Sequence, residues 1–270
     1  MTLLSLAPLT LAALDPITFV RTARQAGFDH VGLRTIAGAP TYRPADMPCL
    51  IRSLAEARAI RAVLDGEGIG VRELEFVALD AETVLEDCRA GLEWGAVLGA
   101  TFLVAASRDE DESRRSDAFA ALADLAAAHG MRVVIEFVPW CAVDTIAAAA
   151  ALARSSDRGA GVLVDTLHLD RTGGSAADIA ALDPALFPYL QLCDGPAERP
   201  TDHAALYRHA SEERLDPGSG AIDLAGVLRA LPAGLPISLE VPSLRRVAAI
   251  GPRAHAIAVR EATEAFLASR

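Results

Sequence analysis

The chain has 270 residues, of which 52% are hydrophobic and 23% charged, and its formal net charge is −11. This composition allows one large core and matches one α/β barrel better than two small domains, so we expect a single domain over residues 1–270. The acidic balance argues against a nucleic-acid partner, because such binding depends on clustered Lys and Arg.

The sequence shows no recognisable membrane span or secretion signal, which favours a cytoplasmic protein. No apolar run reaches the roughly 18 residues of a membrane span, and the four cysteines lack the C-x-x-C spacing typical of redox or metal sites. The apolar start, residues 1–14, lacks a basic region and is interrupted by Pro8, so we interpret it as containing a first strand rather than a secretion signal. We therefore expect no membrane contact and no disulfides.

Short apolar runs alternate with longer amphipathic segments eight times along the chain. The predicted strands cover residues 3–6, 30–33, 71–78, 101–106, 132–137, 161–165, 189–193 and 237–241. The predicted helices cover residues 17–26, 49–67, 81–98, 109–128, 143–153, 176–182, 224–231 and 252–268. Residues 195–220, rich in Pro, Asp and Arg, are predicted as an extended loop. This alternation predicts a single (β/α)8 TIM barrel of the α/β class.

Four polar side chains lie at the ends of the last four predicted strands. They are Glu136, Asp165, Gln191 and Glu240. Buried carboxylates cost free energy unless they are compensated, and a divalent cation is the simplest compensation for three that converge. The pattern therefore predicts a metal site.

Each of these residues also has an ordinary structural interpretation when it is taken alone. Glu136 can pair with a neighbouring arginine, and Asp165 can cap the turn that follows its strand. Gln191 can be a hydrogen-bonded core amide, and Glu240, before Pro242, can lie on the surface. Their coincidence on four adjacent strand ends favours the metal site over four separate explanations.

Five segments carry a family resemblance. They are 135–140 (IEFVPW), 164–168 (VDTLH), 190–196 (LQLCDGP), 214–223 (RLDPGSGAID) and 238–241 (SLEV). Together they resemble the sugar phosphate isomerase/epimerase family, whose members are xylose-isomerase-like barrels. The resemblance is close in the C-terminal half and consists mainly of the strand and helix rhythm in the N-terminal half.

The resemblance implies one divalent metal ion held by Glu136, Asp165, Gln191 and Glu240. Many epimerases have His where this chain has Gln191, and the Glu/Asp/Gln/Glu set is similar to that of the 3-dehydroshikimate dehydratases. An all-oxygen set favours Mn²⁺ or Mg²⁺, with Co²⁺ or Zn²⁺ left open.

The resemblance also implies substrate-binding residues. It places His168 beside the metal, and the paired donors of Arg214 suit a substrate hydroxyl or carboxylate. Taken alone, His168 can have a structural hydrogen-bonding role and Arg214 can be a solvated surface residue. Arg34, Glu75 and Trp140 are further candidates for the pocket wall. Family members usually have Pro-Gly-Glu-Gly where this chain has Ser219 in the third position, a departure that can alter how the loop is anchored.

We interpret the chain as a metal-dependent isomerase or epimerase of carbohydrate metabolism. Its substrate would be a small sugar or a cyclic polyol ketone, and Glu136 and Glu240 would move the proton next to the carbonyl through a metal-stabilised enediolate. An alternative is a lyase that resembles 3-dehydroshikimate or inosose dehydratases, with His168 as the acid for the leaving hydroxyl. An inactive barrel that serves as a binding protein is the alternative of another class, and assembly as a homodimer is left open.

Overall fold

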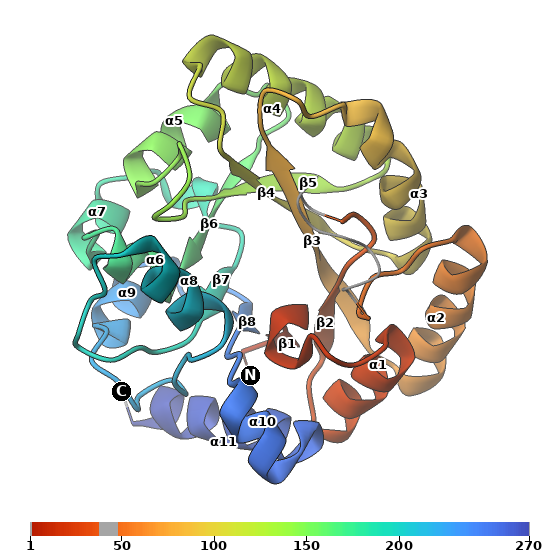
Figure 1. Cartoon of the computed structure of the whole chain (residues 1–270), viewed down its shortest axis with the longest axis vertical. Helices are drawn as coiled ribbons and strands as arrows, with labels where there is room; N and C mark the ends of the chain where they lie inside the picture. The colour runs from red at the N-terminus through yellow and green to blue at the C-terminus, as the bar shows by residue number, and fades with distance from the viewer. Residues whose placement is uncertain (1, 38–47, 270) are drawn as a thin grey trace.

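The computed structural model describes residues 2–37 and 48–269, which form a closed barrel of parallel strands surrounded by helices (Figure 1). The strands follow one another around the barrel in chain order, and the last pairs with the first. They are β1 Leu4–Leu6, β2 His30–Leu33, β3 Gly70–Leu79, β4 Phe102–Ser107, β5 Arg132–Glu136, β6 Gly161–Asp165, β7 Leu190–Leu192 and β8 Ile237–Leu239. The predicted (β/α)8 TIM barrel is confirmed.

Helices connect the strands and cover the outside of the barrel (Figure 1). The α-helices are α1 Pro16–Gln25, α2 Leu54–Glu67, α3 Arg89–Leu98, α4 Glu112–Ala128, α5 Ile146–Arg154, α6 Thr166–Arg171, α7 Ala176–Ala180, α8 His203–Ser211, α9 Leu224–Ala230, α10 Leu244–Ile250 and α11 Pro252–Ala268. Short 3-10 helices are η1 Pro8–Leu11, η3 Leu85–Cys88 and η4 Pro184–Leu186. Within the described residues, none of the helices combines the length and hydropathy needed to cross a membrane.

Apolar side chains pack in two groups on the two faces of the strands. The larger group fills the space between strands and helices, and the smaller group lies inside the barrel. The inner group consists of Phe102, Val104, Val134, Leu163 and Tyr189. Strands covered on both faces have nearly continuous apolar sequences, which is why most were recognisable. Because the inner group fills the centre of the barrel, the space for a ligand lies at the barrel mouth.

Among the helices that differ from the sequence prediction, one does so because a capping side chain sets its start. The helix predicted over residues 49–67 begins only after Ser53, whose hydroxyl accepts a hydrogen bond from the Glu56 N–H. Residues 81–98 form the short helix η3 followed by α3, not one helix.

The prediction of an extended loop over residues 195–220 is wrong for the middle of this range. Helix α8 occupies part of it, and the carboxylate of Asp202 caps this helix by accepting a hydrogen bond from the Ala205 N–H at 2.9 Å. The helix brings its own side chains over the barrel mouth.

Strand register brings the predicted polar residues to one end of the barrel. Asp165 pairs with Gln191 across β6 and β7, and Glu136 pairs with Leu163 across β5 and β6. Glu240 follows β8 directly. Parallel neighbours that end at the same level place these four side chains at the same mouth.

Candidate active site

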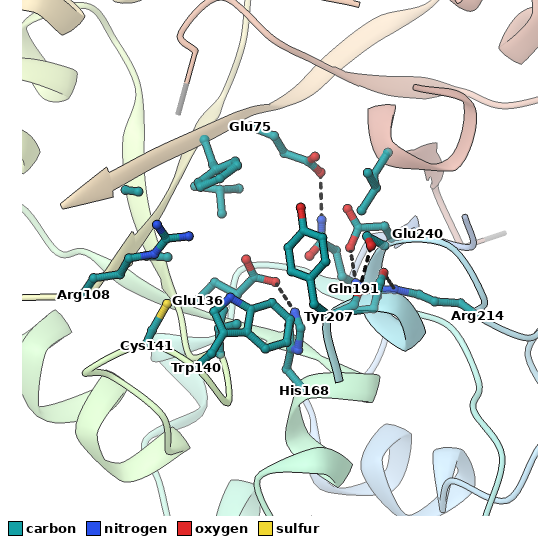
Figure 2. A pocket seen from close by; sticks show the side chains of 18 of the residues that line it. Glu75, Arg108, Glu136, Trp140, Cys141, His168, Gln191, Tyr207, Arg214 and Glu240 are labelled. Carbon is teal, nitrogen blue, oxygen red and sulfur yellow. Dashed lines mark hydrogen bonds and ion pairs between the residues drawn. The ribbon is translucent and has the colours of Figure 1, made fainter. Parts of the chain in front are cut away.

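A cavity of about 150 Å³ opens at the carboxyl ends of the strands (Figure 2). Glu136, Gln191 and Glu240 line it, as do all five residues predicted to bind substrate: Arg34, Glu75, Trp140, His168 and Arg214. Asp165 is fully buried just behind this lining. An apolar cavity of about this volume takes up one benzene molecule, so the space suits a single six-membered ring.

Glu136, Asp165 and His168 converge on one point. Each offers a ligand atom, and these atoms lie within 4.8 Å of one another. The Nε2 atom of His168 is 3.7 Å from Oε1 of Glu136. His168 was predicted to bind substrate, and the structure places it close enough to be a further metal ligand.

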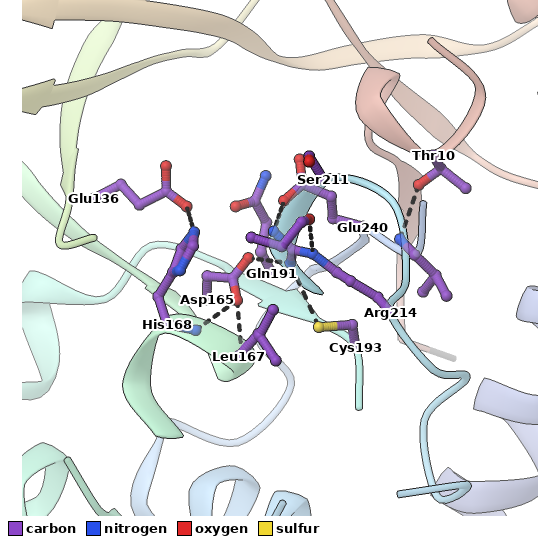
Figure 3. A network of polar contacts seen from close by, with 12 residues as sticks. Thr10, Glu136, Asp165, Leu167, His168, Gln191, Cys193, Ser211, Arg214 and Glu240 are labelled. Atoms are coloured by element: carbon purple, nitrogen blue, oxygen red, sulfur yellow. Dashed lines mark hydrogen bonds and ion pairs between the residues drawn. The ribbon is translucent and has the colours of Figure 1, made fainter. Parts of the chain in front are cut away.

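Asp165 caps a helix, the structural interpretation that the sequence offered, and also pairs with an arginine (Figure 3). Its Oδ1 atom accepts hydrogen bonds from the N–H groups of Leu167 at 2.7 Å and His168 at 3.1 Å, which caps α6. Its Oδ2 atom pairs with Arg214. The cap fixes the carboxylate and, through α6, the position of His168.

Gln191 belongs to a chain of buried polar contacts. Its Nε2 donates to Oε1 of Glu75 at 2.9 Å, and Oε2 of Glu75 pairs with Nη2 of Arg34 at 3.2 Å. The amide nitrogen is therefore committed, which leaves Oε1 of Gln191 buried without a hydrogen-bond partner among the described residues. An unpaired buried oxygen costs free energy, and a bound cation would satisfy it.

Arg214 links two of the predicted metal ligands. Its Nη1 atom pairs with Asp165 and its Nη2 atom with Oε2 of Glu240 at 2.8 Å (Figure 3). The Arg214 side chain is only 1% exposed, and Glu240 is also buried. The surface interpretations of both residues are therefore wrong.

Asp194 anchors the segment that carries Arg214, and we did not predict this role from the sequence. Its buried carboxylate accepts hydrogen bonds from the N–H groups of Gly195, Gly218, Gly220 and Ile222 at 2.8–3.1 Å. Gly218 has a φ of +85°, and a Cβ at Gly220 would collide with the Asp194 carboxylate. No local signal in the sequence indicated this role, because Gly218 and Gly220 lie 24 and 26 residues after Asp194.

Replacing Asp194 with alanine should lower the free energy of unfolding by roughly 2–4 kcal/mol, because several buried N–H groups lose a charged acceptor. Urea denaturation would measure the loss. Asp202→Ala, which removes one exposed helix cap, is the matched control and should cost about 1 kcal/mol. Equal losses in the two variants would contradict the anchoring role.

Burial and mutual repulsion raise the pKa values of three pocket carboxyls. Burial raises the pKa of Glu75 to about 7 and that of Glu240 to about 8, against the opposing effect of nearby arginines. Burial, together with Asp165 and Glu240, raises the pKa of Glu136 well above its usual value. Burial would also raise the pKa of Asp165, but Arg214 and His168 hold it below its usual value.

His168 is neutral at pH 7. Burial lowers its pKa to about 4, although the charge of Asp165 opposes this shift. A neutral imidazole can bind a metal ion or donate one hydrogen bond, and in this structure its Nδ1 atom has no hydrogen-bond partner among the described residues.

The chemistry of these residues fits a divalent cation. Three of the four pocket carboxylates, Glu75, Asp165 and Glu240, pair with the guanidinium groups of Arg34 and Arg214, whereas Glu136 has only the neutral His168 beside it. Glu136 and the unpaired Oε1 of Gln191 supply hard oxygen donors. We propose Glu136, Asp165, Gln191 and Glu240 as its ligands, as in the sequence analysis.

The apparent Mn²⁺ affinity should rise with pH, because the ion must displace protons from Glu136 and Glu240. The expected rise is up to about 10-fold per pH unit for each proton displaced, and the part due to Glu240 should level off above its pKa of about 8. Calorimetric titration with Mn²⁺ would measure it. An affinity that does not change between about pH 6 and 8 would contradict the raised pKa values.

Aromatic side chains form one wall of the cavity. The ring of Trp140 lies edge to face with His168 at 5.5 Å and with His203 at 5.8 Å between ring centroids. Tyr207 of α8 lies 5.7 Å from it. Trp140 thus lies where it was predicted, whereas Tyr207 was missed because its helix was predicted as loop.

Comparison with known proteins identifies the family. Residues 20–264 match the model of the xylose isomerase-like TIM barrel family, so the chain belongs to this family and the predicted resemblance is confirmed. Inosose isomerase from Bacillus velezensis is 23% identical over 221 residues, which cover 76% of this chain and 74% of that protein.

Solved structures share the fold at low sequence identity. A xylose isomerase-like TIM barrel/4-hydroxyphenylpyruvate dioxygenase fusion protein matches with a TM-score of 0.79 and 21% identity, over 97% of this chain and 42% of that longer chain. The IolI protein with a bound zinc atom has a TM-score of 0.78 and 19% identity, over 100% of this chain and 99% of IolI. The probable 3-DHS dehydratase AsbF from Bacillus anthracis has a TM-score of 0.71 and 14% identity, over 96% of this chain and 99% of AsbF.

Proposed function

We propose that this protein is a divalent-metal-dependent isomerase or epimerase that moves a proton next to the carbonyl group of a small polyhydroxy carbonyl compound. The observation that carries the proposal is the placement of Glu136 and Glu240 on different sides of a ring-sized cavity (Figure 2). Two bases on different sides of a substrate can remove a proton from one face and return it to the other.

The residues divide the chemistry among themselves. When bound, the cation polarises the carbonyl and stabilises the negative charge that develops as the proton leaves. Glu136 and Glu240 accept and return the proton, and a bound cation would keep both carboxylates ionised despite the burial that raises their pKa values. His168 and Arg34 provide hydrogen-bond donors for substrate hydroxyls, and Trp140 excludes water from one wall.

A dehydratase is the second candidate, and the contact between His168 and Glu136 favours it. A proton that Glu136 takes from carbon can pass through the imidazole, 3.7 Å away, to a hydroxyl on the next carbon. That hydroxyl leaves as water while a carbon–carbon double bond forms. The pocket amide of Gln191, which matches the dehydratase ligand set, agrees with this candidate.

Incubation of the Mn²⁺-loaded protein with ketoses, inososes and 3-dehydroshikimate in deuterated water, followed by NMR, would test both candidates. We expect deuterium at the carbon next to the carbonyl of the substrate that turns over. An isomeric product supports the isomerase and loss of water supports the dehydratase. Turnover without deuterium incorporation would contradict the proton-transfer mechanism, and the absence of exchange with every compound would contradict the enzyme assignment.

A further inference from the structure

Arg108 follows β4 and points into the cavity from the side opposite Arg214 and Glu240 (Figure 2). Its backbone N–H donates to the carbonyl of Leu79 at 2.8 Å, which fixes the start of this loop to the end of β3. The residue is half-buried. The chain contains no lysine, so every side chain in the pocket that is always cationic is an arginine.

Arg108 differs from the other pocket arginines because no carboxylate pairs with it among the described residues. Arg34 pairs with Glu75, and Arg214 pairs with two carboxylates. The adjacent Asp109 is engaged by both Nε and Nη2 of Arg114.

The contact that Arg108 does make is with the thiol of Cys141. Burial raises the pKa of this thiol to about 11, so it stays neutral and does not balance the charge of the guanidinium group. A ligand that removes water from a guanidinium group without pairing with it incurs a free-energy cost. A neutral polyol would therefore bind poorly on this side of the cavity.

The lining of the cavity also has an apolar part. Ala78, Ala106 and Val104 line the cavity, and all three are buried. The small alanine side chains leave room for a flat ring. One ring of the size that the cavity accepts would therefore meet Arg108 at one end and the carboxylates at the other.

We propose that Arg108 binds a carboxylate carried by the substrate ring, so that the substrate is an anionic ring ketone and not a neutral sugar. This inference rests on the proposed function of the same pocket. A carboxylate suits the planar fork of one arginine. A phosphate dianion suits this side less well, because the N-terminus of the nearby helix α4, a common phosphate-binding element, is capped by Asp111.

The test measures binding of shikimate, its methyl ester and myo-inositol 1-phosphate to the Mn²⁺-loaded protein by calorimetry. The variants are Arg108→Gln and Arg108→Lys. Arg158→Gln is the control, because it removes the same charge from an exposed ion pair with Asp124. A parallel Mn²⁺ titration of each variant reports whether the metal site is intact.

We expect shikimate to bind the wild type about 10- to 100-fold more tightly than the methyl ester does, and Arg108→Gln to lose this preference. Arg108→Lys should retain part of it, and Arg158→Gln all of it. Equal binding of acid and ester, an unchanged preference in Arg108→Gln, or no shikimate binding up to about 10 mM would overturn the proposal.

Tighter binding of the inositol phosphate would overturn the assignment to a carboxylate. A changed Mn²⁺ affinity with an unchanged acid preference would place Arg108 with Glu136 instead. These outcomes are independent of the deuterium experiment, which alone decides whether the pocket is catalytic.

Discussion

Replacing Glu240 with glutamine should lower turnover by about 10²–10⁴-fold, because an amide cannot accept the substrate proton. Metal binding should be weakened much less, since the amide oxygen can still coordinate and the remaining ligands are unchanged. In the metal-free protein burial raises the pKa of Glu240 to about 8, and a bound cation would favour the ionised carboxylate that can accept a proton. Steady-state kinetics with Mn²⁺ titrations on the same preparations would separate the two effects.

Deuterium exchange sharpens this prediction. In the wild type, solvent deuterium should enter the substrate carbon next to the carbonyl. In Glu240→Gln, it should not enter that carbon. Glu264→Gln, which alters an exposed pair with Arg260, should behave as wild type. Unchanged turnover in Glu240→Gln would remove this residue from the mechanism.

The parts of the fold that local pattern determines were predictable. Strands buried on both faces gave apolar runs, and helices gave amphipathic segments between them, so the barrel followed from their alternation. Glu136, Asp165, Gln191 and Glu240 could be assigned to one mouth because parallel strands place their carboxyl ends together.

The parts that depend on contacts distant in sequence were not predictable. Arg214 was expected to face the substrate, yet it pairs with Asp165, 49 residues earlier, and with Glu240. No local periodicity encodes such a contact. Asp194 was likewise read only as part of a motif, although it holds the turn at Gly218 and Gly220. Helix α8 was missed because its residues are flanked by Pro, Asp and Arg, which also occur in loops.

The pairing of Arg214 with two proposed metal ligands implies a competition between guanidinium and cation. In this structure Arg214 compensates Asp165 and Glu240, which a divalent ion would otherwise do. A bound ion would share these carboxylates and weaken their ion pairs with Arg214. The guanidinium group of Arg214 could then bind a substrate oxygen. Metal binding and substrate binding would be coupled through this one side chain.

Arg214→Gln should therefore destabilise the metal-free protein by about 3–5 kcal/mol at pH 8, because two buried carboxylates lose their partner. The loss should shrink as pH falls, since Glu240 without Arg214 takes up a proton more readily than in the wild type. Mn²⁺ should stabilise the variant more than it stabilises the wild type, because the cation replaces the missing positive charge. Urea denaturation with chelator or with Mn²⁺ would measure each change.

Arg246→Gln is the matched control for this prediction. Arg246 also pairs with an aspartate, Asp216, but its side chain is 31% exposed, so the loss should be about 0–1 kcal/mol and should not respond to Mn²⁺. A loss in Arg214→Gln no larger than in this control would mean that the buried pairing contributes little to stability. A large loss that Mn²⁺ does not reduce would mean that the ion does not occupy the position between Asp165 and Glu240, and the proposed ligand set would then have to be abandoned.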